Sequence, residues 1–503
     1  MKKKKELIII LGSLLVVVLS VTLAYFTTEI FGSGKDISLD SANLKITFSS
    51  GSGNISGVNI EPGWSSGIST FTVKNESNDT YKYNIVIKDL VNTFVTTGFL
   101  QYKITSTDSG YNMSAFKDIP KSTTQKDTIL AYSVEIAKGV THTYGVELKY
   151  ASSEVDQSDD MGKILSGTLY IEKGTEDPHG IYAQGTLGWQ IMDDNLTRET
   201  RTDFSTTFTT TNTGTLYKAT ESIAGGTAKD VYYFAGNATN NWVKFGGFYW
   251  RIIRTNADGS VRLLYSGTTT NTTSGYIGKS KFNSTYSDAM YVGYMYGTSG
   301  TQASNRTNEN NSTIKGVIDN WYSTNLSGYT KYISTEAVYC NDREVGSGTY
   351  SATGSSFYYA AYTRLYTNNA PSYNCTNSKD AFSGSNAEAK LTYPIGLMTA
   401  DEITYAGGYR YTTLTSPYAW YYINSAGGSI TGSTYWWLLS PGAWNGTYAF
   451  SWSVRCSDYP GDLSGVNVNY SSSGVRPAIS IKGDALYSKG DGSPEKPYEI
   501  VYN

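Results

Sequence analysis

The chain has little histidine, proline or charge. His142 and His179 are its two histidines in 503 residues, which argues against His-rich zinc sites and, in the C-terminal half, against a histidine-based catalytic triad. Charged residues make up 17% and the net charge is −3, so we expect no nucleic-acid partner. With 11 prolines, a proline-rich stalk across a cell wall is not expected. We predict no metal site and no cofactor.

Cysteine is also scarce, and all of it comes late in the chain. Cys340, Cys375 and Cys456 are the three cysteines. Outside the cell two of them can pair, which leaves the third over. Cys340 and Cys375 flank one insertion rich in glycine and tyrosine, and this favours them as the disulfide. Three unpaired thiols are the alternative.

Tyrosine and glycine are abundant instead. The chain has 44 tyrosines and 51 glycines, and aromatic residues reach 14%. Strands that face solvent favour aromatic and β-branched residues, and their turns favour glycine and asparagine. An uncharged, tyrosine-rich surface is typical of exported bacterial proteins. At this length we expect two or three compact units.

The amino terminus indicates export. MKKKKE precedes an uncharged apolar run, Leu7–Phe26. Lysines before such a run keep the amino end inside the cell. The run is long enough for either a signal peptide or a membrane anchor helix, over residues 1–26. Thr22 and Ala24 suit cleavage before Tyr25. We predict a location outside the cell, on its surface or anchored in its membrane, with the membrane as a partner if the helix is retained.

Residues 27–175 read as an all-β sandwich. Seven runs alternate between apolar and polar residues and end at turn-forming residues: NLKITFSS, STFTVKN, YKYNIVIKDL, LQYKITS, TILAYSVEIA, HTYGVELKY and SGTLYIEK. This period of two predicts antiparallel strands with one buried face. His142 lies on one of these runs, and we expect it on the surface.

Part of this region resembles a known family. AYFTT at Ala24–Thr28, then SANLKITF with Ala42 and Leu44, then EPGWSSGISTFTVKN are similar to the TasA/camelysin family of biofilm-matrix proteins. The resemblance implies a jelly-roll-like sandwich, removal of the leader by a signal peptidase, and assembly into fibres by strand donation. The plainer alternative is a spacer that lifts the next domain off the membrane.

Residues 176–212 read as a linker. Threonine is dense there, charge is scattered and periodicity is weak, apart from one short ordered segment around TLGWQIM. His179 is expected to be a solvated linker residue.

Residues 213–503 read as an α+β domain. FYWRIIRT and SVRLLYSG are joined by NADG, which predicts a β-hairpin. IKGVIDNWYSTNL has the spacing of an amphipathic helix. Thr399 with Glu402 predicts a capping box at the start of a second helix, and Gly407 its end.

The order of motifs in this domain also carries a resemblance. VKFGGFYWRIIR, CNDR, YPIGLMTADEI, WWLLSP and GVRPAISIK follow one another as in a recurrent C-terminal domain of Gram-positive surface proteins. The order is also similar to the C-type-lectin-like fold of the formylglycine-generating-enzyme type. In that fold a Gly–aliphatic–Arg strand closes the domain, which implies that role for Gly474, Val475 and Arg476. Arg476 is expected to be a structural cation that pairs with a buried carboxylate or with backbone carbonyls.

If that fold holds, residues 442–473 are displayed between two core strands, Trp436–Pro441 and Gly474–Ile481. Tyrosine and tryptophan give contact area with few rotatable bonds, and serine, glycine and asparagine give adaptable hydrogen bonding. The candidate ligand-binding residues are Trp444, Asn445, Tyr448, Trp452, Ser457, Asp458, Tyr459, Asn467, Asn469 and Tyr470. The alternative for a third to a half of this segment's residues, Trp452 and Phe450 in particular, is that they alternate inward as core packing.

The same fold carries the variable region of receptors that retroelements diversify. Asparagine, aspartate, tyrosine, serine and glycine dominate the mutated positions there, and residues 445–470 are rich in them. Diversification of this chain is therefore a further hypothesis.

Catalysis is not expected. A formylglycine-type oxidase needs two close cysteines, and Cys456 has no near partner in the sequence. Glycoside hydrolysis needs two carboxylates that face a cleft, whereas Asp401 and Glu402 are adjacent on a predicted helix and point apart. The sequence predicts a surface protein, adhesin- or receptor-like, that binds an unknown protein or glycan. The alternative is a structural biofilm-matrix protein that self-assembles into fibres through its sandwich.

Overall fold

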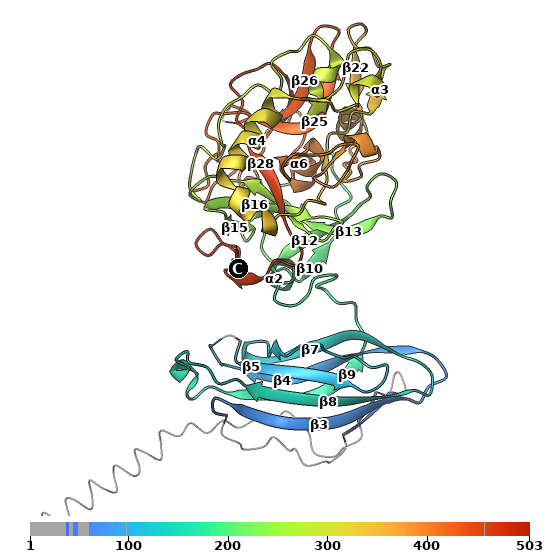
Figure 1. Ribbon diagram of the computed structural model, residues 1–503, viewed down its shortest axis with the longest axis vertical. Coiled ribbons are helices and arrows are strands. Elements are labelled where there is room, and N and C mark those ends of the chain that lie inside the picture. The colour runs from blue at the N-terminus through green and yellow to red at the C-terminus, as the bar shows by residue number, and fades with distance from the viewer. Residues whose placement is uncertain (1–36, 40–43, 49–59, 97, 457, 503) are drawn as a thin grey trace, which may run out of the picture. The chain divides into compact units, whose positions relative to one another are not determined.

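The computed structural model describes residues 37–39, 44–48, 60–96, 98–456 and 458–502. The chain is mainly β and divides into two compact units, one ending at Asp177 and the other spanning Pro178–Asn503 (Figure 1). The expected leader lies outside the described residues. No helix in the described part of the chain is both long enough and apolar enough to cross a membrane.

The first unit contains two antiparallel sheets. One has the strand order β1-β2-β3-β8-β5-β6 and the other the order β7-β4-β9. The strands are β1 (Ile37–Leu39), β2 (Leu44–Phe48), β3 (Trp64–Asn75), β4 (Tyr81–Asn92), β5 (Leu100–Ser106), β6 (Lys117–Asp118), β7 (Ser122–Ile136), β8 (Thr141–Tyr150) and β9 (Leu165–Lys173), with one 3-10 turn, η1 (Ser158–Asp160). All seven alternating runs of the sequence fall on these strands, and apolar residues of both sheets form one core.

The prediction for His142 was wrong. The residue is 1% exposed, because β8 alternates and places it on the same buried face as Tyr144. Its Nδ1 lies 2.8 Å from the Tyr83 hydroxyl, and its Nε2 lies 3.2 Å from the hydroxyl of Ser109. Burial lowers the pKa of His142, with Asp108 opposing, so the ring is held neutral as a hydrogen-bonded core residue.

Residues 178–212 are not the expected linker, since they belong to the second unit. Helix α2 (Leu187–Asp194) is capped by Thr186, and Leu187 and Ile191, four residues apart, are buried in the core. His179 is not solvated either. It is 5% exposed and stacks on Trp189, with the ring centroids 4.4 Å apart.

The second unit is built around an eight-stranded sheet with the order β10-β12-β13-β16-β17-β28-β24, and β15 pairs with β16. A five-stranded sheet has the order β21-β22-β25-β26-β27, and the other strands form two-stranded sheets. The strands are β10 (Thr197–Glu199), β11 (Thr211–Asn212), β12 (Thr215–Glu221), β13 (Lys229–Tyr233), β14 (Asn237–Ala238), β15 (Trp242–Phe245), β16 (Phe248–Thr255), β17 (Val261–Tyr265), β18 (Met295–Tyr296), β19 (Asn310–Asn311), β20 (Tyr339–Cys340), β21 (Val345–Ser347), β22 (Phe357–Tyr359), β23 (Ala381–Phe382), β24 (Gly396–Leu397), β25 (Trp436–Trp444), β26 (Ala449–Val454), β27 (Leu463–Asn467), β28 (Pro477–Ile481), β29 (Tyr487–Lys489) and β30 (Glu499–Ile500).

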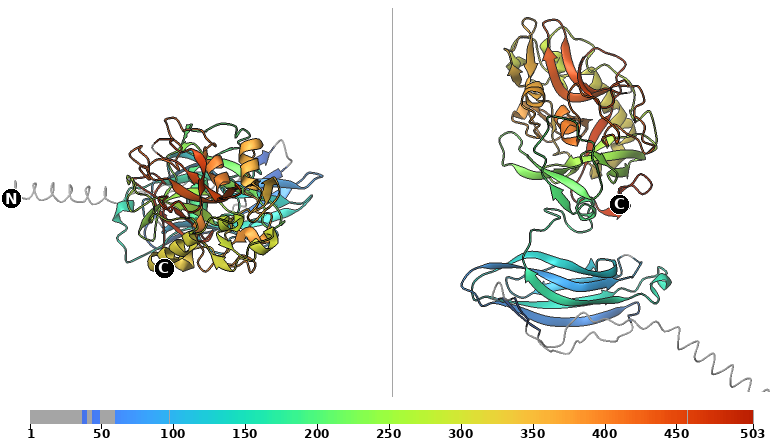
Figure 2. Two further views of the ribbon diagram at one scale, coloured as in Figure 1. Left: turned by 90° about the horizontal axis from the view of Figure 1, so that it is seen from above. Right: turned by 180° about the vertical axis from the view of Figure 1, so that it is seen from behind.

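Short helices connect these strands. Besides α2 they are η2 (Ala289–Val292), α3 (Gln302–Asn305), α4 (Thr313–Asn325), η3 (Ser327–Tyr332), α5 (Ala360–Tyr362), the π-helical turn η4 (Thr363–Thr367), η5 (Ser378–Asp380) and α6 (Ala400–Ala406). Within this unit the five-stranded sheet lies at the end farthest from α2 and β10 (Figures 1 and 2).

Several local predictions are confirmed. β16 and β17 form the expected hairpin, and α4 is the expected amphipathic helix. Thr399 and Glu402 form the capping box of α6. Arg476 is buried and donates to the carbonyls of Tyr265 and Tyr421, so it is a structural cation held by backbone oxygens.

Candidate functional site

The candidate site is the outward face of the five-stranded sheet. Register places Tyr358, Ala443, Phe450 and Asn467 in one row, since Tyr358 pairs with Ala443, Ala443 with Phe450, and Phe450 with Asn467. Directly paired residues of antiparallel strands share a face. All four are exposed or partly exposed, so this face is open to solvent. Trp452 is two residues beyond Phe450 and belongs to the same face.

Residues 442–473 do not form a displayed loop. They continue β25 to Trp444 and add β26 and β27, so most of the segment is sheet. Trp444 and Trp452 are each 1% exposed and belong to the core, which corrects their assignment as ligand-binding residues. Trp444 faces inward, and Tyr362, with its ring centroid 6.3 Å away, packs over Trp452. Core packing, the alternative expected for Trp452 and Phe450, holds for Trp452 because Tyr362 covers it, whereas Phe450 is partly exposed on the outward face.

The remaining candidates lie in two groups, one at each end of β26. A strand rises about 3.4 Å per residue, so the two ends of this six-residue strand are roughly 17 Å apart. One group lies at the β25–β26 turn and just after β27: Asn445, Tyr448, Asn467, Asn469 and Tyr470. Tyr448 is 37% exposed and stacks on Tyr286, and Tyr470 is 45% exposed. The other group lies between β26 and β27, where Asp458 is exposed and Tyr459 is 46% exposed. Ser457 lies outside the described residues.

Between these ends, sequence reasoning missed a cluster that we name the Arg410 cage: Tyr362, Tyr366, Arg410 and Tyr411. The guanidinium carbon of Arg410 lies 4.2, 3.4 and 4.1 Å from the ring centroids of Tyr362, Tyr366 and Tyr411. Nη2 of Arg410 donates to the Tyr362 hydroxyl at 3.0 Å. The rings come from α5, η4 and the segment after α6, so no local pattern brings them together.

Two unusual backbone features support the cage. Tyr366 lies in the π-helical turn η4, and Tyr362 immediately precedes it. This conformation is rare and is frequent at functional sites. Tyr411 has a φ of 51°, which is uncommon for a bulky residue and is retained only where its surroundings hold it. The backbone N–H of Tyr411 donates to the carbonyl of Leu463, which fixes the segment beside β27.

Asp462 holds the segment after Tyr411. Its Oδ1 accepts the backbone N–H of Thr412 at 3.1 Å, and its Oδ2 lies 3.6 Å from Nη1 of Arg455. Burial raises the pKa of Asp462 to about 6, against the opposing charge of Arg455. The carboxyl therefore titrates well above its usual range, in direct contact with the cage segment.

This shift predicts a pH effect. The folded protein holds the Asp462 proton more tightly than the unfolded chain does, so the group's stabilising contribution is present at about pH 4 and is lost as the pH rises to about 6. Asp462→Asn imitates the protonated form and should gain stability relative to the parent chain as the pH rises across this range. Thermal unfolding of both proteins at several pH values measures the difference. Parallel curves would show that Asp462 has an ordinary pKa.

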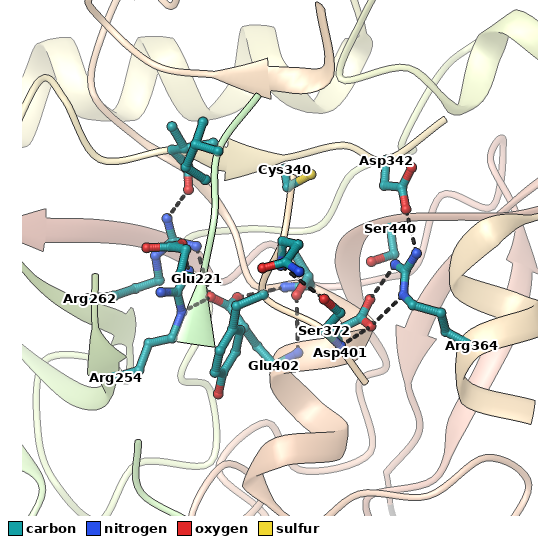
Figure 3. Close-up of a pocket in the computed structure, with 15 residues that line it drawn as sticks. Glu221, Arg254, Arg262, Cys340, Asp342, Arg364, Ser372, Asp401, Glu402 and Ser440 are labelled. Atoms are coloured by element: carbon teal, nitrogen blue, oxygen red, sulfur yellow. Dashed lines mark hydrogen bonds and ion pairs between the residues drawn. The ribbon is translucent and has the colours of Figure 1, made fainter. Parts of the chain in front are cut away.

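A separate narrow crevice lies beside α6 (Figure 3). On one side Glu402 accepts from Nε of Arg254 at 3.0 Å and from Nη1 of Arg262 at 2.8 Å. Arg254 also pairs with Glu221 at 2.8 Å. Burial raises the pKa of Glu402, but Arg262 and Arg254 outweigh it and hold the pKa below its usual value.

On the other side of the crevice Arg364 pairs with two carboxylates. It lies 3.0 Å from Asp401 and 2.6 Å from Asp342 (Figure 3). All the carboxylates that line the crevice are thus paired with arginines. The ion pairs that line the crevice form a network that joins α6 to the strands around it.

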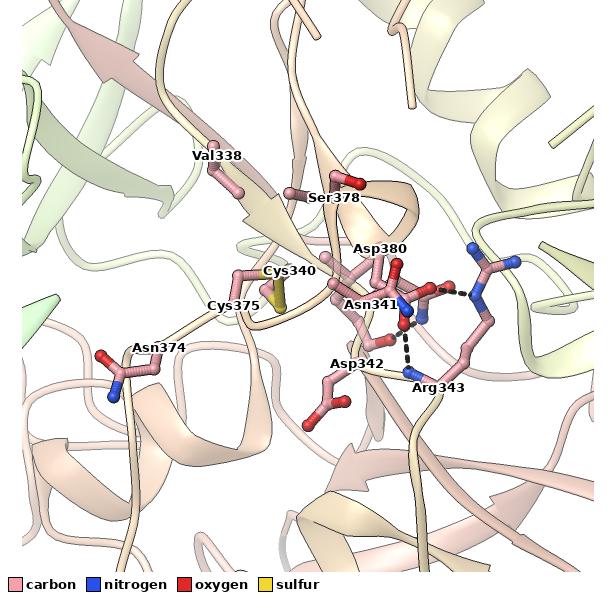
Figure 4. The surroundings of a disulfide bond; sticks show 12 residues. Val338, Cys340, Asn341, Asp342, Arg343, Asn374, Cys375, Ser378 and Asp380 are labelled. Atoms are coloured by element: carbon pink, nitrogen blue, oxygen red, sulfur yellow. Dashed lines mark hydrogen bonds and ion pairs between the residues drawn. A yellow bond between two sulfur atoms is a disulfide. The ribbon is translucent and has the colours of Figure 1, made fainter. Parts of the chain in front are cut away.

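A disulfide closes one wall of this crevice. The sulfur atoms of Cys340 and Cys375 are 2.08 Å apart, in agreement with the preferred pairing (Figure 4). Cys456 is free and buried. The bond joins β20 to a segment whose Cys375 exchanges backbone hydrogen bonds with Ser222 and Ala224. In the part of the chain described, no group of three or more histidine, cysteine, aspartate or glutamate side chains could hold a metal ion.

Comparison with known proteins adds little. No family model matches the chain, and no curated protein matches it. Among solved structures, AvmM, which catalyses macrocyclization in alchivemycin A biosynthesis, matches 30% of this chain and all of its own length, with 14% identity and a TM-score of 0.14. This match supports no inference about fold or activity.

Proposed function

We propose that this chain is an exported cell-surface protein, adhesin- or receptor-like, that binds a ligand through the outward face of its five-stranded sheet. The observation that carries the proposal is the set of exposed rings there: Tyr358 is 41% exposed, Tyr366 50% and Tyr411 59%. Solvent-exposed tyrosine rings offer a large contact area to a ligand, and their few rotatable bonds keep the loss of conformational entropy on binding small. Export is supported by the lysines that precede the apolar leader.

The proposal includes finer assignments of fold and origin. The first unit would be jelly-roll-like, as in the TasA/camelysin family, and the second C-type-lectin-like. The buried Arg476 and the paired core strands β17 and β28 support the second assignment. Diversification by a retroelement rests on the composition of residues 445–470, and a template copy beside the gene would support it. A gene locus without such a copy would indicate a ligand-binding surface that is not diversified.

We propose binding and not catalysis because the exposed face offers no nucleophile paired with a base. Among the described residues, the polar groups near the Arg410 cage are tyrosine hydroxyls and the guanidinium of Arg410, with asparagine amides and the Asp458 carboxylate toward the ends of β26. Hydroxyls, amides and a guanidinium recognise a ligand by stacking and hydrogen bonding and do not abstract protons at neutral pH.

The test is a double substitution on the whole chain. Tyr366→Ser with Tyr411→Asn removes two exposed rings, and asparagine tolerates the positive φ at residue 411. We expect capture of bacterial or host cells to fall at least about tenfold, with a change in unfolding free energy of about 1 kcal/mol or less.

The matched control is Tyr502→Ser, which removes a 48% exposed ring near the C-terminus. This variant should capture cells as the parent chain does. Capture that survives the double substitution, or falls equally in the control, would refute the assignment of the binding face.

The alternative is a structural matrix protein assembled through the first unit. The observation that favours it is β7, a 15-residue strand that pairs with β4 on one side and, among the described strands, with none on the other. Such an edge can accept a further strand. Filaments in electron micrographs of the purified chain, together with cell capture that does not depend on the tyrosines, would favour this alternative.

A further inference from the structure

Among the described buried arginines of the second unit, Arg410 alone has neither a carboxylate partner nor more than one hydrogen-bond acceptor. It is 7% exposed, and its Nε and Nη1 have no hydrogen-bond partner in the described structure. Among the described residues no carboxylate pairs with Arg410, and the Tyr362 hydroxyl is the one acceptor of its guanidinium. A guanidinium taken out of water normally needs an anion or several acceptors.

The other buried arginines of this unit show what is missing. Arg254, Arg262, Arg306 and Arg343 each pair with at least one carboxylate. Arg251 and Arg476 have no carboxylate, but each donates to three oxygens of neighbouring residues. Arg410 has neither kind of compensation, although its backbone is fixed by the pairing with Leu463.

The groups that cover Arg410 are those most able to move aside. Tyr366 and Tyr411 are the most exposed rings of the cage, so rotating either side chain opens the guanidinium without disturbing the core. Tyr362, which is partly buried, stacks on Tyr358 with centroids 3.8 Å apart and extends the ring surface along the sheet. The cage is thus a cation at the base of an aromatic surface.

The chemistry of the surroundings favours a sugar over a peptide. In the described part of the second unit, the large exposed hydrophobic residues from 358 to 470 are all tyrosines, and the exposed aliphatic ones are Ile181, Leu196 and Leu486. A peptide site would need an apolar pocket for an anchor side chain. Flat rings that carry hydroxyls suit the faces and hydroxyls of a sugar.

We propose that Arg410 binds the carboxylate of an acidic sugar in a cell-surface glycan, while Tyr366 and Tyr411 stack against the sugar ring. This inference rests on the proposed binding function and specifies its ligand. A carboxylate completes the charge that the fold leaves uncompensated, through charge-assisted hydrogen bonds to Nη1 or Nε. The ligand's anion thereby takes the place that an aspartate or glutamate occupies at the unit's ion-paired arginines.

The experiment measures binding of the whole chain to paired probes. Polygalacturonate, hyaluronan, alginate and a sialylated lactosamine are each compared with the same glycan after its carboxyls are reduced to alcohols. We expect at least one acidic probe to bind about tenfold or more tightly than its reduced partner. Equal affinities within every pair, or no binding to any acidic probe, would overturn the proposal. Preference for polyglutamate over all the glycans would overturn it in favour of an acidic peptide.

Variants assign the effect to the residue. Arg410→Gln should bring the affinity for the acidic probe down to that for its reduced form, and Arg410→Lys should restore part of it. Arg198→Gln is the matched control, because Arg198 also lies over a tyrosine ring, at 5.4 Å from the centroid of Tyr232, and donates to backbone carbonyls. Near-ultraviolet circular dichroism checks that each variant is folded.

The outcomes separate the two proposals. If Arg410→Gln binds as the parent chain does while the tyrosine double variant loses cell capture, the carboxylate inference fails and the binding face stands. If neither variant changes cell capture, both fail.

Discussion

Glu402→Gln is expected to lower the free energy of unfolding of the second unit by about 3–5 kcal/mol. Glu402 is 1% exposed and compensates two buried guanidinium groups, those of Arg254 and Arg262. Glutamine keeps the shape but removes the charge, so Arg254 retains Glu221 as its carboxylate partner and Arg262 retains the carbonyl of Val338 but no carboxylate. Breaking one member of a buried ion network leaves charge without compensation in a low-dielectric interior.

Denaturant unfolding followed by tryptophan fluorescence measures this loss, since the unit's core contains several fully buried tryptophans. The matched control is Glu495→Gln, which changes an exposed glutamate of the same unit and should cost less than about 0.5 kcal/mol. Equal stability of the two variants would mean that the network around α6 is solvated.

Removing the disulfide is expected to cost about 3–4 kcal/mol. Cys340 and Cys375 are 35 residues apart, and a link of that length restricts the unfolded chain by roughly this amount. The bond also holds the segment that contributes Ser372 and Arg364 to the crevice, so its loss should loosen the ion pair between Arg364 and Asp401. The variant is Cys340→Ala with Cys375→Ala.

Reduction provides an independent check on the same effect. A thiol reductant should lower the stability of the parent chain toward that of the double variant and leave the double variant unchanged. Cys456→Ala, which removes the free buried thiol, should remain sensitive to reductant. A parent chain that reductant does not destabilise would contradict the expected contribution.

Local features of this chain could be read from its sequence. The hairpin of β16 and β17, helix α4 and the capping box of α6 each depend on residues within about one element, where periodicity and capping chemistry are decisive. Seven of the nine described strands of the first unit could be predicted for the same reason. Arg476 was assigned correctly because a cation next to an apolar strand must find acceptors inside.

Features that depend on residues far apart in the chain could not be predicted from the sequence. Residues 442–473 look like a binding loop in composition, but Trp444 and Trp452 are covered because β25 and β26 pair and because Tyr362 folds over from another segment. The Arg410 cage joins α5 and the adjoining η4 to the segment after α6, which lies more than 40 residues further along the chain. The ordered segment around TLGWQIM was expected and is α2, but the linker assignment failed because the contacts that bury α2 in the second unit, such as the hydrogen bond from Leu187 to Ala485, are non-local.

The outward face of the five-stranded sheet is the central claim, and tyrosine nitration tests it most directly. In the free protein we expect Tyr366 and Tyr411 to react, because half or more of each side chain is exposed. On target cells or on the preferred acidic glycan, both should be protected, while Tyr502 should react as before. Undiminished nitration of Tyr366 and Tyr411 in the bound protein would contradict the account.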